Sequence, residues 1–210
     1  MNLLNLAFLA DLVAIRRDIH AHPELAFHET RTADIVAREL TAYGLEVHRG
    51  LAKTGVVGVL RKGTSGRAIG LRADMDALPI AEATGAAFAS THPGKMHACG
   101  HDGHMAMALA AATYVDRTIR EQPGAIRRNV LFVFQPAEET TGGAKTVCES
   151  GVFERYGADR IFGFHVWPDL PAGTLASCSG PLLARSSETH IHIHGTKQAI
   201  IVIHAQNLGM

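Results

Sequence analysis

The stretch NVLFVFQPAEE, residues 129–139, decides the fold class of this sequence. Its first six residues form an almost unbroken apolar run, which is typical of a strand covered on both faces of a sheet. A second run, RIFGFHV at residues 160–166, has the same character. Glu138 and Glu139 follow the first run, and His165 lies near the end of the second. Because ligands of open α/β sheets bind at the carboxyl ends of strands, we expect these polar groups to meet at one edge of an α/β sheet.

Patterns on either side of these runs predict further helices and strands. Helices are expected at residues 3–19, 30–43, 103–121 and 142–153, the third of them buried over most of its surface. Short strands are expected at residues 45–48, 56–61 and 68–72, following one another as a meander, and a loop is expected at residues 74–98. The sequence therefore predicts a mixed, mostly parallel sheet between helices.

The amino-acid composition limits the classes of partner and ligand that are expected for this chain. The chain has 210 residues, 47% of them hydrophobic, and its 20 basic residues balance its 20 acidic ones. This balance argues against nucleic acid or an anionic membrane as partner and leaves a small molecule as the expected ligand. Three cysteines are an odd number for a disulfide framework, and the N-terminal stretch lacks a basic leader, so we expect a cytoplasmic protein. Cys148 and Cys178 are interpreted as small buried residues.

The segment HACGHDGH, residues 97–104, gathers a thiol, three imidazoles and a carboxylate directly before a predicted helix. Gly100 lets the backbone turn so that Cys99 and His101 converge, and a cation is the natural centre of such a cluster. The spacing fits neither paired Cys-x-x-Cys knuckles nor a His-Glu-x-x-His helix. His97 and His104 are left open between ordering the loop and touching substrate, and neither is assigned to a metal.

The carboxylate pair Glu138 and Glu139 is the second chemical feature. Two adjacent carboxylates between apolar strands repel each other unless a cation or a proton intervenes, so one can bind metal while its neighbour handles protons. His165 is a further donor at the same edge of the sheet. Asp74 ends another predicted strand and could accept the second ring N–H of a metal-binding histidine, which would fix the tautomer of that ring.

Together with RRDIHAHPEL, RADMDALP and GFHVWP, these motifs resemble the metallopeptidase-related family of aminoacylases, hippurate hydrolases and auxin-conjugate hydrolases. The similarity runs from about residue 12 to residue 187. It implies a zinc-peptidase-like catalytic domain with two divalent metal ions, of manganese, zinc, nickel or cobalt. Carried over residue by residue, it implies metal ligands at Cys99, His101, Glu139 and His165, a general base at Glu138, and Asp74 in contact with a ligand.

The resemblance also implies the reaction. The family hydrolyses the amide bond of N-acyl amino acids and releases a carboxylic acid and a free amino acid. Bound divalent cations make water a nucleophile at neutral pH and polarise the scissile carbonyl. Two alternatives stay open, a dipeptidase using the same chemistry and an inactive fragment that binds metal or a partner chain through an exposed sheet edge.

The C-terminal residues depart from the family pattern. Family members continue through a dimerising lid domain with a Gly-Gly-His-Ala stretch and return to a last histidine ligand, whereas residues 196–210 read TKQAIIVIHAQNLGM. We therefore expect residues 1–186 to be the N-terminal part of a catalytic domain. Residues 187–210, which include an alternating strand pattern at 188–194, are expected to begin a truncated or frameshifted lid. The family's homodimer would depend on this lid.

Overall fold

The computed structural model describes residues 6–140 and 142–182 of the chain. Contacts divide the chain into two compact units, Met1–Val166 and Trp167–Met210. The elements of the first unit are α1 (Leu6–Ala21), α2 (Thr30–Ala42), β1 (Glu46–Leu51), β2 (Gly55–Leu60), β3 (Ala68–Asp74), α3 (His101–Glu121), β4 (Asn129–Gln135), α4 (Gly143–Glu149), α5 (Val152–Arg155) and β5 (Ala158–Gly163). The predicted domain boundary at residue 186 and the predicted strand at 188–194 lie outside the described residues.

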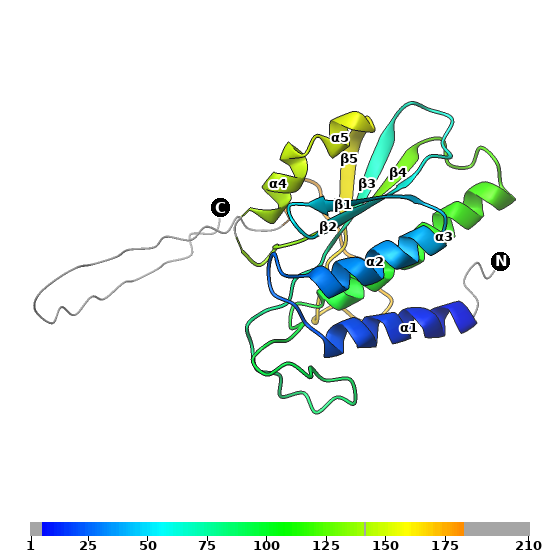
Figure 1. The fold of residues 1–210 in the computed structure, drawn as a ribbon. Coiled ribbons are helices and arrows are strands. Elements are labelled where there is room, and N and C mark those ends of the chain that lie inside the picture. Colours follow the sequence, from blue (N-terminus) through cyan, green and yellow to red (C-terminus); the bar gives the residue numbers. More distant parts are fainter. Residues whose placement is uncertain (1–5, 141, 183–210) are drawn as a thin grey trace, which may run out of the picture. The chain divides into compact units, whose positions relative to one another are not determined.

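The sheet is mixed, with strand order β1-β2-β4-β3-β5 (Figure 1). β1 pairs with β2 and β2 with β4 in antiparallel fashion, whereas β3 is parallel to both β4 and β5. The predicted meander is therefore wrong in its third strand, because β4 lies between β2 and β3. Helix α3 forms the crossover connection between the parallel strands β3 and β4. As a result, β3, β4 and β5 all end at the same edge of the sheet.

The two apolar runs differ in burial. β4 is buried from Val130 to Gln135, as the sequence predicts for a central strand. β5 is exposed along most of its length, because in the described part of the chain it pairs only with β3 and lies at the edge of the sheet. The prediction of a central strand at residues 160–166 is wrong in this respect, and the strand ends at Gly163, two residues before His165.

Helices cover the two faces of the sheet unequally. Helices α1, α2 and α3 lie on one face, and α4 and α5 lie on the other (Figure 1). The large core under α1 to α3 includes Leu40, Leu109 and Phe132. Helix α3 is buried along one side of its first three turns only, and Met107 and Tyr114 are exposed, so the expected burial over most of its surface is wrong.

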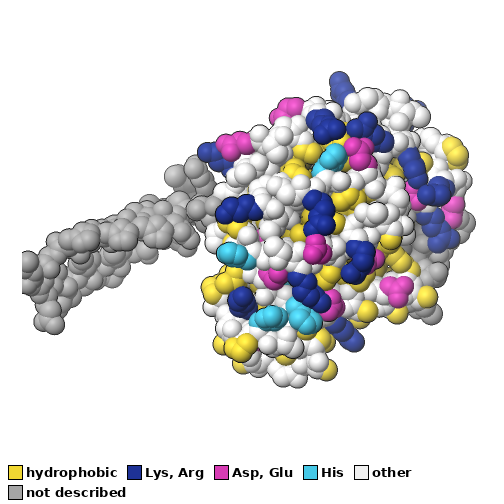
Figure 2. Space-filling view, in the orientation of Figure 1, with side chains coloured by type: hydrophobic (Ala, Val, Ile, Leu, Met, Phe, Trp, Pro, Cys, Tyr) yellow, Lys and Arg dark blue, Asp and Glu magenta, His cyan; other side chains and the backbone are white. Residues whose placement is uncertain are grey.

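The exposure of two cysteines contradicts an expectation from the sequence. Cys148 and Cys178 are exposed rather than buried. Acidic and basic side chains are interspersed on the face drawn in Figure 2, in keeping with the balanced composition. None of the helices among the described residues combines the length and the apolar character of a membrane span.

Candidate metal centre

The first turn of α3 places His101 over the carboxyl ends of the parallel strands. The residue before it, Gly100, has φ +91°, and a Cβ at this position would lie 2.5 Å from a methyl carbon of Val166. Only glycine fits such a left-handed conformation at such a close approach. The glycine of the Cys-Gly-His motif thus lets the chain turn sharply into the helix while the segment after β5 packs against it.

The His101 ring is completely buried. Its Nδ1–H donates to the backbone carbonyl of Asp76 at 2.8 Å, so Nε2 carries a lone pair in the neutral ring. Among the described residues, this Nε2 has no hydrogen-bond partner. It lies 3.5 Å from a carboxylate oxygen of Asp74, 3.7 Å from one of Glu139 and 3.8 Å from one of Glu138. Burial disfavours the charged ring, but Asp76 and Asp74 outweigh it and raise the pKa of His101.

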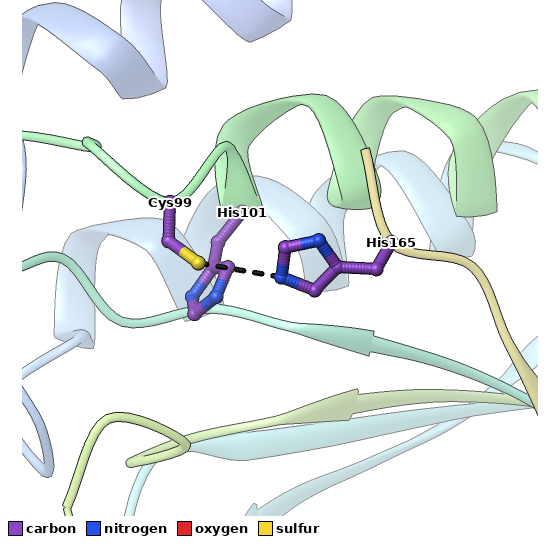
Figure 3. Close-up of side chains that lie close together, drawn as sticks. All are labelled: Cys99, His101 and His165. Atoms are coloured by element: carbon purple, nitrogen blue, oxygen red, sulfur yellow. Dashed lines mark hydrogen bonds between the residues drawn. The ribbon is translucent and has the colours of Figure 1, made fainter. Parts of the chain in front are cut away.

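Cys99 and His165 reach the same place from two other segments (Figure 3). Cys99 lies in the loop before α3, and its Sγ is 3.3 Å from Nε2 of His165, which follows β5. Ligand atoms of Cys99, His101 and His165 all lie within 4.8 Å of one another. Burial and the negative charge of Glu139 raise the pKa of the Cys99 thiol to about 12. The thiolate form therefore requires a nearby cation.

Asp76 fixes the loop that carries the two glutamates. Its Oδ1 accepts the Glu138 N–H and its Oδ2 accepts the Glu139 N–H, each at 2.9 Å. The loop adopts this shape directly after β4, with Ala137 at φ +53°. The Glu138 side chain is 40% exposed and that of Glu139 is 21% exposed. Burial, together with the charge of Glu138, raises the pKa of Glu139.

Asp74 connects the end of β3 to α3. Its Oδ1 accepts the Nδ1–H of His104 at 2.6 Å, and its Oδ2 accepts from Arg72, also at 2.6 Å. Burial opposes the charge of this carboxylate, but the hydrogen bond with His104 and the nearby positive charges lower the pKa of Asp74 to about 2. The carboxylate is therefore ionised at neutral pH.

A divalent cation fits this set of residues. Four carboxylates gather here, from Asp74, Asp76, Glu138 and Glu139, with Arg72 as the positive side chain bonded to one of them. Two buried atoms, Nε2 of His101 and Oε1 of Glu139, lack a hydrogen-bond partner among the described residues. Buried polar atoms are costly to leave unpaired, and imidazole nitrogen, thiolate and carboxylate oxygen are the usual ligands of zinc and related metals.

The structure brings together every residue that the sequence singled out for the site. His101 forms one candidate metal-binding group with Cys99 and His165 and another with Glu138 and Glu139. The assignment of Cys99, His101, Glu139 and His165 as metal ligands and of Glu138 as the general base remains a prediction. Asp74 contacts the ring N–H of His104 rather than that of His101, whose ring N–H is bonded to the Asp76 carbonyl instead.

Two residues make important contacts at the site, although no role there was predicted for them from the sequence. One is Asp76, for which the alternating Asp-Met-Asp after a predicted strand was an available signal, since alternate residues share a side. The other is His104, whose role the sequence alone does not decide and which shares a helix face with His101. His104 accepts the Val166 N–H at 2.9 Å and so holds the segment that carries His165. His97, also left open, is buried, which lowers its pKa to about 4.

An α/β sheet with such donors at the ends of its parallel strands has the architecture of a metallohydrolase catalytic domain. A comparison with known protein families supports this class of protein. Residues 70–203 match the model of peptidase family M20/M25/M40. The chain belongs to this family.

Relatives and solved structures extend the comparison. The chain is 45% identical over 181 residues to a hippurate hydrolase of Campylobacter jejuni, covering 86% of this chain and 46% of that protein. It is 43% identical over 184 residues to an N-acetyldiaminopimelate deacetylase of Exiguobacterium sibiricum, covering 87% of this chain and 48% of the relative. The structure resembles that of the YXEP protein of Bacillus subtilis, described as a dinuclear metal binding peptidase of the M20 family. The TM-score is 0.74 and the identity 42%, over 81% of this chain and 46% of that one.

These comparisons confirm the predicted family and the α/β fold class. The chain spans about half the length of the curated relatives it matches.

Proposed function

We propose that this chain carries the amide-hydrolysing centre of a metal-dependent N-acyl-amino-acid amidohydrolase. The observation that carries the proposal is the buried Nε2 of His101, which has no hydrogen-bond partner within residues 6–140 and 142–182, faces the Glu138–Glu139 pair and lies beside Cys99 and His165. Family membership supports it. Hippurate and N-acetyldiaminopimelate, named in two relatives, are both N-acyl amino acids.

Four side chains would hold the metal in this proposal, namely Cys99, His101, Glu139 and His165. The chain would bind two divalent ions, of manganese, zinc, nickel or cobalt, and a dinuclear description of one solved relative supports that number. When bound, such ions activate water and polarise an amide carbonyl. Asp76 would keep the imidazole of His101 in the tautomer that leaves Nε2 free for the metal.

Glu138 would act as general base and then as general acid. Its carboxylate takes a proton from the attacking water as the oxygen bonds to the carbonyl carbon, and it gives that proton to the amine nitrogen as the C–N bond breaks. The products are a carboxylic acid and an amino acid. The side chain is 40% exposed, which leaves it accessible to substrate, and Asp76 holds its backbone N–H in place.

The test is an assay of the purified 210-residue chain with manganese or zinc on a panel of N-benzoyl, N-acetyl and dipeptide substrates. We expect hydrolysis of N-acyl amino acids, and we expect Glu138→Ala to lower kcat by about 10²- to 10⁴-fold while the bound metal is unchanged. Glu149→Gln removes an exposed carboxylate on α4 and serves as the control. Turnover that survives Glu138→Ala contradicts the assignment of the base. Preference for dipeptides would instead identify a dipeptidase.

The exposed edge strand β5 favours a second candidate, a chain that binds metal or a partner without catalysis. Metal bound at stoichiometric amounts without turnover of any substrate would support it. Sizing chromatography separates a monomer from the homodimer that the family resemblance suggests and from complexes with a partner chain. We also propose a cytoplasmic location, which the odd number of cysteines supports. Fractionation of cells would test it.

A further inference from the structure

A buried carboxylate outside the proposed metal ligands contacts the loop that carries Glu138 and Glu139. Glu29, the residue before α2, is completely buried. Its Oε1 accepts the N–H of Ala137 at 2.9 Å, and its Oε2 accepts the hydroxyl of Thr54 at 2.5 Å. A buried carboxylate is costly unless its charge is met by hydrogen bonds, so its presence here requires an explanation.

The explanation that Glu29 caps α2 does not agree with the contacts. Glu29 makes no capping hydrogen bond to α2 with its side chain. The free N–H groups of Arg31 and Thr32 are taken instead by Glu24, at 3.1 and 2.8 Å. The carboxylate of Glu29 is directed away from its own helix, towards Thr54 and Ala137.

Ala137 is the strained point of the loop. It has φ +53°, a left-handed conformation that residues with a side chain seldom adopt, and it is 1% exposed. Strain of this kind persists only where the surroundings hold it, and it is concentrated at functional sites. Without Glu29, the buried N–H of Ala137 would lose its acceptor.

The same loop is held at two further points. The next two amides, of Glu138 and Glu139, both donate to Asp76. On another side Gly143 packs so closely that a Cβ there would lie 1.9 Å from the carbonyl oxygen of Pro136. Three consecutive N–H groups are thus bound by two buried carboxylates that come from distant parts of the sequence.

We infer that Glu29 is a positioning residue, which fixes the left-handed turn at Ala137 and thereby directs the Glu138 and Glu139 side chains towards His101. The fixed loop is a property of the protein alone. Its consequence for metal binding rests on the proposed function. Glu29 itself touches neither His101 nor the two glutamate side chains among its described contacts, so its effect passes through the backbone of Ala137.

The test compares Glu29→Ala and Glu29→Gln with the control Glu24→Ala in the 210-residue chain. Glu24→Ala removes hydrogen bonds at the start of the same helix but leaves the loop contacts intact. Amide hydrogen exchange at Ala137, relative to Phe132 in the core of β4, is measured on the metal-free chain. Zn²⁺ affinity is then measured by calorimetry.

In Glu29→Ala we expect exchange at Ala137 to rise about 10- to 100-fold relative to Phe132, because a charge-assisted hydrogen bond is lost. Zn²⁺ affinity should fall at least about tenfold. Glu29→Gln keeps one acceptor for Ala137 and can donate to Thr54, so it should fold and show a smaller rise, with most of the Zn²⁺ affinity restored. Glu24→Ala should lower the melting temperature without a selective change at Ala137.

Equal exchange at Ala137 in Glu29→Ala and Glu24→Ala would overturn the inference. If Glu29→Ala does not fold, unchanged relative exchange at Ala137 in Glu29→Gln would overturn it equally. Faster exchange with unchanged Zn²⁺ affinity would also overturn the positioning role. Should the unsubstituted chain bind no divalent cation, the proposed function fails, whereas exchange at Ala137 still decides whether Glu29 fixes the loop.

Discussion

Two buried polar clusters lie on either side of the first turn of α3, and they differ in how their charges are matched. The metal-centre cluster consists of Asp74, Asp76, His101, Glu138 and Glu139. The second, here called the α1–α3 cluster, consists of Arg16, His20, Glu82 and Asp102. His101 and Asp102 are neighbours in the sequence, yet each belongs to a different cluster.

In the α1–α3 cluster, positive or neutral donors alternate with carboxylates. Oδ2 of Asp102 accepts from Arg16 and from His20, both at 3.0 Å, whereas its buried Oδ1 has no hydrogen-bond partner among the described residues. The other nitrogen of His20 lies 3.2 Å from Glu82. Charges that are paired and hydrogen-bonded in this way need no ion to be buried. The cluster joins α1 to α3 and to the loop before α3, which is a structural role.

In the metal-centre cluster, carboxylates outnumber their cationic partners. Arg72 is bonded to Asp74, while Nε2 of His101 and Oε1 of Glu139 lack hydrogen-bond partners among the described residues. Such an arrangement is stable only if a cation or extra protons are added. Each cluster thus contains a buried oxygen without a partner among the described residues, and what distinguishes the metal-centre cluster is its excess of carboxylates over cationic side chains.

The largest effect is expected from Asp76→Ala. This change removes the acceptor of two partly buried hydrogen bonds, and each hydrogen bond to a charged acceptor is worth about 1.5–3 kcal/mol. We expect a loss of about 3 kcal/mol or more in the free energy of unfolding, together with loss of metal binding. Urea denaturation and metal titration measure the two effects. Asp76→Ala with full metal affinity would contradict the role of the Asp76 carboxylate in placing Glu138 and Glu139 at the metal centre.

The second-largest effect is expected from removal of metal, which should act on the metal-centre cluster and not on the α1–α3 cluster. At a free zinc concentration about 100-fold above Kd, binding raises the free energy of unfolding by about 2.7 kcal/mol, and a chelator reverses the gain. Cys99→Ser should reduce this gain, because the chain loses a thiolate ligand. Cys148→Ser, the same change at an exposed cysteine, is the matched control and should leave the gain intact. A gain of equal size in both variants would remove Cys99 from the ligand set.

The same contrast shows how far sequence reasoning reached. The sequence pointed to Cys99, His101, Glu138, Glu139 and His165 because these residues stand in dense polar motifs at the ends of predicted strands or before a predicted helix, and the structure places them close together. The topology that unites them was predicted in outline, because long apolar runs indicate parallel strands ending at one edge. An apolar run, however, does not tell which strand lies beside it. For this reason the predicted meander was wrong in its third strand, and β5 was predicted to be a central strand although it lies at the edge of the described sheet.

The buried acids were beyond sequence reasoning for another reason. Glu and Asp are seldom fully buried, so composition statistics place them on the surface. Glu29 and Asp76 are buried only because backbone N–H groups of a distant loop require acceptors. Those contacts span 108 and 62 positions in the sequence, and no local pattern marks them.

Acid should weaken the metal-centre cluster through Asp74. Its pKa of about 2 lies below the ordinary value of 3.8 for an aspartate, so the ionised carboxylate contributes stability that is present above about pH 4 and is lost as the pH falls towards 2. We expect about 2 kcal/mol from this shift. The free energy of unfolding of the metal-free chain, measured against Asp74→Asn, should show a difference that shrinks over this pH range. A constant difference would contradict the assignment of the shift to Asp74.

The smallest effect should come from Arg16→Met in the α1–α3 cluster. The Arg16 side chain is 49% exposed, so water competes for its charge, while Asp102 keeps its contact with His20. A partly exposed ion pair of this kind is worth up to about 1 kcal/mol, and methionine preserves most of the aliphatic packing. Thermal unfolding should show this small loss, and calorimetry should show unchanged zinc affinity. A fall in zinc affinity comparable to that of Cys99→Ser would mean that the clusters are coupled through the His101–Asp102 backbone, and the distinction between a structural and a metal-binding cluster would fail.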